Sequence, residues 1–210
     1  MTLIYPMFAM VVLTVIVLFF VMLASESDAA AVKNLKNCDG VYSGTYKNVT
    51  VQPGGSCTLT PDATVLGGVH AKKGAENLYV QTAVGLNVQA HGVTGTVYVG
   101  PGPNKNGKLC TYDPPVGNNV MVKDSHNVLI CYVHADNNIK VTDNDGCITV
   151  RKSVAENNLT VARNEAFTGD CNAKHSRPGA IRVLKNGYGN QLTVKDNSGR
   201  LELVKKNYAL

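Results

Sequence analysis

One short motif recurs along this chain at a nearly constant interval. An Asn-Asn pair followed by alternating apolar residues begins at residue 118 (NNVMV), residue 137 (NNIKV) and residue 157 (NNLTV), at offsets of 19 and 20 residues. A fourth copy, NQLTV, begins at residue 190 after an insertion. The turns that follow the four copies, VKDS, VTDN, VARN and VKDN, repeat as well. A repeat of this length cannot bury its apolar side chains alone, so neighbouring repeats must stack on one another.

Stacking at the usual spacing between β-strands, about 4.8 Å, predicts the fold. Alternate side chains of each motif face opposite ways, so Val141 points inward and Thr142 outward. Residues 45–204 then correspond to about eight coils, and we predict a mostly-β parallel β-solenoid over residues 38–210. A β-sandwich with strands every 8–12 residues or so is the alternative, but the in-register recurrence of whole motifs favours the solenoid. The inward residues of three successive coils are expected to be Val120, Val122, Ile139, Val141, Leu159 and Val161.

The N-terminal segment has a different character, because no charged side chain precedes Glu26. About 24 helical residues span about 36 Å, which is enough to cross a bilayer core of about 30 Å. Helix-forming residues continue to Lys36, so we expect one hydrophobic helix over residues 1–36. Three interpretations of this helix compete: a cleaved signal peptide, a retained membrane anchor and a helix that packs in a filament core. Small residues at Ala29–Ala31 suit cleavage, but the positive segment that begins a signal peptide is missing.

Six cysteines, an even number, indicate disulfides in an oxidising compartment. Six cysteines allow about fifteen connectivities, but the coil length selects one. Cys38 and Cys57 are 19 residues apart, Cys110 and Cys131 are 21 apart, and Cys147 and Cys171 are 24 apart, each about one coil. Residues stacked at about 4.8 Å lie within the Cα separation of about 4.4–6.8 Å that a disulfide requires. We therefore predict three sequential disulfides and a location outside the cytoplasm.

The sequence shows no catalytic constellation, and we expect neither an enzyme nor a cofactor. Asp124 and Asp143 occupy the same point of successive turns, and such stacked carboxylates suit Ca²⁺, but Asp is also simply a good turn residue. The histidines lack metal-ligand spacing, so no metal site is predicted. A polysaccharide lyase would need an acidic metal cluster beside a basic residue, which the sequence lacks. Asn48-Val-Thr50 and Asn158-Leu-Thr160 are glycosylation sequons.

The net charge of +5 at pH 7 lies entirely within residues 38–210, because the charges of residues 1–36 cancel. No run of Lys or Arg and no aromatic platform accompanies it, so nucleic-acid binding is not expected.

Two segments resemble known families. The run GTYKNVTVQPGGSCTLTPDATVLGGVHAKKGAENLYV is similar to a broad family of secreted bacterial β-helix repeat proteins, and its coils look like those of bactofilins, which form polymers. This resemblance covers about residues 38–161 and implies a right-handed β-helix with no known reaction. MTLI, running straight into an apolar helix, resembles a processed type IV pilin, although position 5 is Tyr5 where that family has an acidic residue.

These observations suggest a structural subunit of an extracellular, cell-surface filament, pilin-like in layout. The apolar helix would associate with copies of itself and contact a membrane at least transiently. The alternative is a membrane-anchored or secreted solenoid that binds glycan or protein partners, and a carbohydrate-active enzyme ranks third.

The cysteine spacing makes a direct prediction. Peptide mapping under non-reducing conditions is expected to recover Cys38–Cys57, Cys110–Cys131 and Cys147–Cys171, because each pair then spans one coil. A bridge from Cys38 to Cys147 or Cys171 would rule out this coil register.

Overall fold

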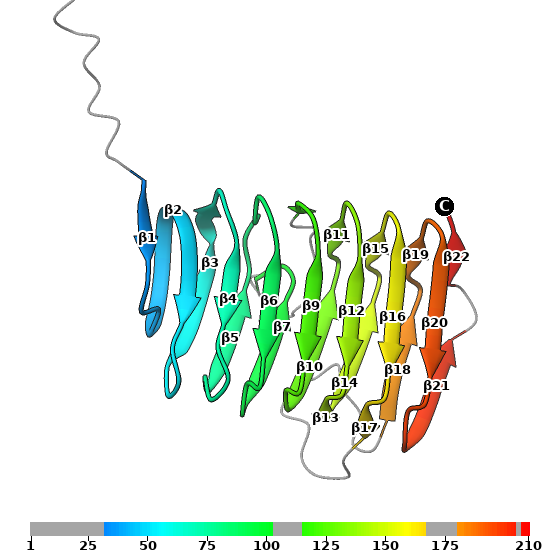
Figure 1. The fold of residues 1–210 in the computed structure, drawn as a ribbon. Helices are drawn as coiled ribbons and strands as arrows, with labels where there is room; N and C mark the ends of the chain where they lie inside the picture. The colour runs from blue at the N-terminus through cyan, green and yellow to red at the C-terminus, as the bar shows by residue number, and fades with distance from the viewer. Residues whose placement is uncertain (1–31, 103–114, 167–179, 205–206) are drawn as a thin grey trace, which may run out of the picture. The chain divides into compact units, whose positions relative to one another are not determined.

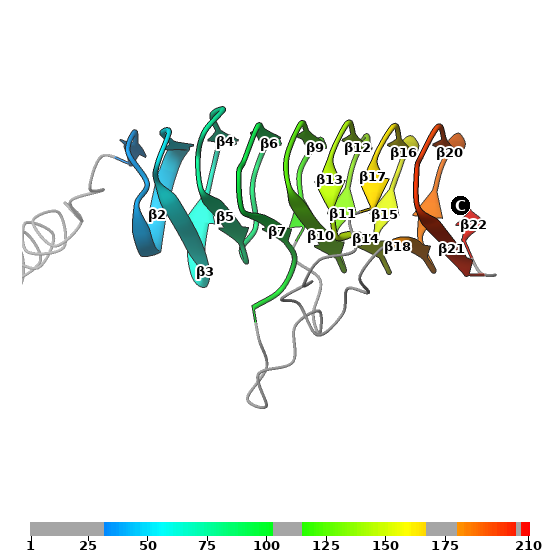
Figure 2. The ribbon, with the colours of Figure 1, turned by 90° about the horizontal axis from the view of Figure 1, so that it is seen from below.

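The computed structural model describes residues 32–102, 115–166, 180–204 and 207–210. The chain divides into two units, Met1–Val32 and Lys33–Leu210, and every described strand belongs to the second unit. All of the paired strands in this unit run parallel and stack as in a β-solenoid, which confirms the predicted mostly-β architecture (Figures 1 and 2). The strands form three walls, and each coil passes through the first, second and third wall in turn.

The first wall contains the repeated Asn-Asn motif. Its strands are β1 (Lys33–Leu35), the end of β2 (Gly40–Val51), β4 (Val69–Ala71), β6 (Val88–His91), β9 (Val120–Lys123), β12 (Ile139–Thr142), β16 (Asn158–Ala162) and β20 (Gln191–Lys195).

The second wall follows it in every coil. Its strands are the beginning of β2, β3 (Ser56–Val65), β5 (Asn77–Val80), β7 (Thr96–Val99), β10 (Asn127–Cys131), β14 (Ile148–Arg151), β18 (Ala180–Leu184) and β21 (Arg200–Val204).

The third wall has the shortest strands. They are β8 (Pro115–Val116), β11 (His134–Ala135), β15 (Val154–Ala155), β19 (Gly187–Tyr188) and β22 (Tyr208–Ala209), and the long strands β2 and β3 extend into this wall in the first coils. Two short strands, β13 (Asp145–Gly146) and β17 (Glu165–Ala166), pair at the corner between the first and second walls.

The register of the first wall is the one that the repeat predicts. Ile139 pairs with Val120 on one side and with Leu159 on the other, and Val141 pairs with Val122 and Val161 in the same way. These six residues are at most 1% exposed, which confirms them as core. Because each inward column repeats one class of side chain, branched aliphatic groups pack on their own kind along the interior.

Two expectations about individual residues are wrong. Thr142 follows the inward Val141 on β12 and was expected to lie outward in solvent, but it is only 1% exposed and lines a depression. Residues Lys33–Leu35 form strand β1 against β2, so a helix cannot continue to Lys36. No helix capable of spanning a membrane occurs in the part of the chain that the structure describes, and residues 1–31 lie outside that part.

A disulfide joins Cys38 to Cys57 across one coil, with a Cα–Cα distance of 5.2 Å. Cys131 and Cys147 are also disulfide-bonded. Their predicted partners, Cys110 and Cys171, lie outside the described residues, so the pairing of these four cysteines stays a prediction.

Buried asparagines line the corner between the first and second walls, where the chain turns inward. Asn164 Oδ1 accepts hydrogen bonds from the backbone N–H of Asn144 at 3.0 Å and from Asn144 Nδ2 at 2.9 Å. Asn197 receives the same pair of bonds from Asn164, and Asn144 receives one from the backbone of Ser125. We call Ser125, Asn144, Asn164 and Asn197 the corner ladder. It satisfies backbone groups that the turn leaves without a strand partner, which otherwise would cost about 1–3 kcal/mol each.

Adjacent residues on opposite faces of β12 provide a test of the core. Val141→Asp places a charge among aliphatic side chains and is expected to lower the free energy of unfolding by several kcal/mol, on the order of 3 or more. Lys140→Asp, which replaces an exposed residue, is expected to change it by less than about 1 kcal/mol. Urea denaturation measures both, and equal losses would contradict the assigned faces.

Candidate functional site

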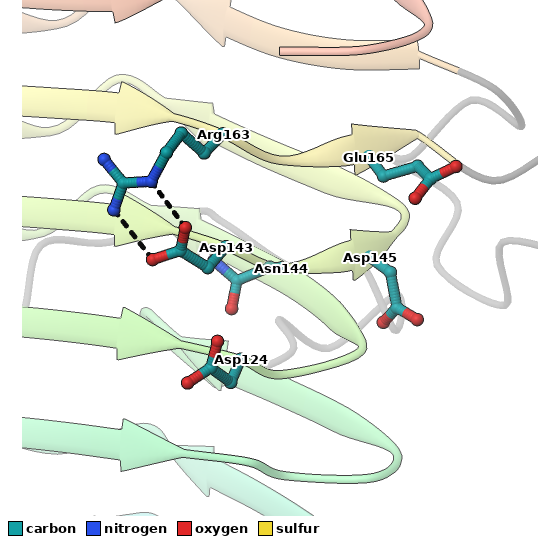
Figure 3. A pocket seen from close by; sticks show the side chains of 6 residues that line it. All are labelled: Asp124, Asp143, Asn144, Asp145, Arg163 and Glu165. Carbon is teal, nitrogen blue, oxygen red and sulfur yellow. Dashed lines mark hydrogen bonds and ion pairs between the residues drawn. The ribbon is translucent and has the colours of Figure 1, made fainter. Parts of the chain in front are cut away.

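Charged side chains gather outside the corner ladder. Asp124, Asp143 and Arg163 each precede a ladder residue and have positive φ angles of 48°, 59° and 54°. This left-handed conformation reverses the chain direction locally, so the charged side chain stays outside while the next residue, Ser or Asn, points inward. Together with Asp145 and Glu165, which belong to the paired strands β13 and β17, they line a shallow pocket (Figure 3).

A bidentate ion pair dominates this pocket. Arg163 Nε donates to Asp143 Oδ1 at 2.6 Å and Arg163 Nη2 donates to Asp143 Oδ2 at 2.8 Å, so the two groups link successive coils (Figure 3). The hydrogen bonds from Arg163 hold the pKa of Asp143 below its ordinary value of 3.8, and the charge of Arg163 acts in the same direction. Asp143 is therefore a stable anion that is already neutralised by its neighbour.

Two further acidic groups of the corner, Asp124 and Asp145, also have basic partners. Asp124 Oδ2 lies 2.9 Å from His91 Nε2 and 3.4 Å from Lys123 Nζ. Asp145 Oδ1 lies 2.8 Å from His126 Nδ1. The structure thus brings Asp124 and Asp143 to equivalent positions of successive turns, as predicted, but each carboxylate faces a cation or a histidine. Within the described ranges, no three His, Cys, Asp or Glu residues come together in a way that could hold a metal ion.

A second candidate surface is the outer face of the first wall. Its central outward column runs in register from Thr50 through His70, Gln89, Met121 and Lys140 to Thr160, one residue per strand. The column ends at Thr193 on β20 and contains no acidic residue. A shallow depression of about 370 Å³ lies over β9, β12, β16 and β20, and a smaller one of about 250 Å³ lies over β2, β4 and β6.

An amide ladder borders this column. Asn119 donates through its side chain to Asn87 at 3.0 Å, Asn138 donates to Asn119 at 3.0 Å, and Asn158 donates to Asn138 at 3.0 Å. We call Asn87, Asn119, Asn138 and Asn158 the outer amide ladder. Because each side chain is held by the next, the amides are fixed in orientation along the wall rather than free to rotate.

Both predicted glycosylation sequons contribute asparagines to this wall. The Asn48 side chain donates to Asn34 at 3.0 Å and accepts from the backbone N–H of Gly68 at 3.0 Å. Asn158, half-buried, uses its side-chain nitrogen in the outer amide ladder. The nitrogen that a glycan would modify is thus hydrogen-bonded in both residues.

Sequence reasoning missed both asparagine ladders, although their signal was present. The Asn-Asn pairs and the turn asparagines recur at the coil interval, and identical amides at one coil position can hydrogen-bond along the stack. Three of the histidines lie beside a carboxylate of the next coil, including His134 Nε2, which is 2.6 Å from Glu156 Oε1.

Comparison with protein-family models, with curated proteins and with solved structures finds no match to this chain.

The Arg163–Asp143 pair predicts a pH-dependent contribution to stability. Because the folded pKa of Asp143 is lowered, the contribution is complete above pH 3.8 and is lost as the pH falls through the lower folded value. Arg163→Gln is expected to lower the urea midpoint at about pH 7 and to have a smaller effect at about pH 2. In the Asp143→Asn background the same substitution should have little effect at either pH, and a loss independent of pH and background would contradict the assignment.

Proposed function

We propose that the protein is a non-catalytic structural subunit of an extracellular, cell-surface filament, pilin-like in layout, whose solenoid is a right-handed β-helix. Residues 1–31 supply the apolar helix that packs in the filament core and inserts in a membrane before assembly. The disulfide between Cys38 and Cys57 is in keeping with an oxidising compartment. The observation that carries the proposal is a difference between the two ends of the solenoid.

Large aromatic side chains close the N-terminal end of the core. Tyr42 and Tyr46 pair with the buried residues Leu59 and Val65, so they occupy inward positions of the first coil. Their rings meet edge to face with centroids 6.4 Å apart. Both side chains are half-buried and pack against the core. This end thus carries its own cap, as the terminal repeats of solenoids require.

The C-terminal end has no comparable cover among the described residues. Leu192 and Val194 occupy the inward column of β20 but are only half-buried, whereas their equivalents one coil earlier are fully buried. Leu201, Tyr208 and Leu210 are 41%, 52% and 61% exposed. The strands β20, β21 and β22 are also the last described strands of their walls, with one edge unpaired. An apolar surface beside free strand edges favours contact with another chain, which a neighbouring subunit of a filament provides.

A second candidate function is a membrane-anchored or secreted solenoid that binds glycan or protein partners. The polar depression on the first wall favours it, and the two functions are compatible in one molecule.

Charge substitutions at the C-terminal end test the filament proposal. The full-length chain is expected to form filaments visible by negative-stain electron microscopy after detergent removal. The double variant Leu201→Glu and Leu210→Glu should instead give short oligomers, because two charges would be buried at each contact. The matched control, Leu66→Glu and Leu86→Glu, changes leucines that are 55% and 53% exposed elsewhere, and it should assemble normally.

A chain that begins at Val32 keeps strand β1 but lacks the apolar segment, and it is expected to remain monomeric. Native-like filaments from this truncated chain would overturn the helix-core arrangement and would mean that contacts at the C-terminal end of the solenoid are sufficient for assembly. Monodisperse full-length protein after detergent removal would overturn the filament proposal itself.

A further inference from the structure

The C-terminal depression of the first wall is a site with positive charge and no acid in its lining. Lys140 on β12 and Lys195 on β20 border it, two strands apart and thus about 10 Å across the sheet. Both lysines are exposed, and neither forms an ion pair with any described residue. Arg163 adds a third cation at the rim, although its charge is shared with Asp143.

Between the lysines the surface is polar and shaped in advance. Asn119, Asn138 and Asn158 of the outer amide ladder line one side, and their orientation is fixed by hydrogen bonds along the stack. Thr160 and Thr142 also line the depression, and Thr142 is only 1% exposed. These side chains are already ordered in the folded protein, so binding a ligand does not cost the conformational entropy of ordering them.

The shape of the surface selects an extended ligand. The wall presents one outward side chain per coil in a straight register, at the strand spacing of about 4.8 Å. The depression is open and shallow rather than enclosed, which suits a chain of repeating polar units better than a compact molecule. The acid-free column continues past the depression as far as Thr50, so a longer polymer meets no repelling carboxylate on this line.

We propose that the first wall binds a polysaccharide that carries carboxylate groups, with Lys140 and Lys195 holding two of its acidic units and the outer amide ladder hydrogen-bonding its hydroxyl groups. The two lysines favour a ligand with acidic groups because their charges are complementary. The ordered amides and threonines can hydrogen-bond to the hydroxyl groups of sugars. Nucleic acid is also an anionic polymer, but no aromatic side chain on which bases could stack lines the depression. The site lies on one side of the stack and does not depend on filament assembly.

Binding of the full-length chain in detergent micelles to immobilised polymers tests this site. Sodium alginate, a polyuronate, is the probe, and dextran and single-stranded DNA are the comparisons. Alginate is expected to bind, with an affinity that falls as salt increases, and dextran is expected to bind at least about tenfold more weakly. The double variant Lys140→Gln and Lys195→Gln should weaken alginate binding by about tenfold or more.

The matched control is Lys72→Gln with Lys185→Gln, which removes the same net charge from two exposed lysines outside the depression. It is expected to weaken alginate binding by less than about threefold. Equal losses in the two double variants would show that only the overall charge attracts the polymer. Equal losses would therefore overturn the proposal. It would also be overturned if DNA bound as tightly as alginate, or if alginate did not bind at low salt. None of these readouts depends on whether filaments form.

Discussion

Backbone pairing between parallel strands holds each coil to the next, and it places every residue directly over its counterpart one coil earlier. Ile139 lies between Val120 and Leu159 for this reason, and Lys140 lies between Met121 and Thr160 on the opposite face. A side chain in such a stack has neighbours of its own column above and below. Aliphatic columns gain from this arrangement, whereas a column of like charges would be destabilised.

Asparagine is the polar residue that suits this constraint, because its amide is both donor and acceptor and carries no charge. In the corner ladder, the side-chain oxygens of Asn144 and Asn164 each accept from the preceding coil, and their nitrogens donate to both the preceding and the following coil. On the outside of the same corner, the carboxylate of Asp143 lies beside the guanidinium of Arg163 from the next coil.

Much of this architecture could be predicted from the recurrence of one pentapeptide. The inward column of the first wall and the disulfide between Cys38 and Cys57 follow from the coil length alone. The burial of Thr142 could not be predicted, because it depends on the side chains of neighbouring coils rather than on strand alternation. Strand β1 was missed because Lys33–Leu35 has helix-forming residues and becomes a strand only by pairing with β2. The acid-free outward column could not be predicted either, because the number of residues between successive strands varies. Only the strand register shows, for example, that Gln89 pairs with Met121.

The unequal ends of the solenoid have a consequence for how the molecule comes apart. In a one-dimensional stack each coil is stabilised by its nearest neighbours, so unfolding proceeds most easily from a terminal coil that has only one. At the N-terminal end, a covalent bond between Cys38 and Cys57 and the packed rings of Tyr42 and Tyr46 oppose this opening. At the other end Leu192 and Val194 are half-exposed. The solenoid therefore frays in one direction, and amide hydrogen exchange would decrease coil by coil from β20 toward the disulfide-bonded start.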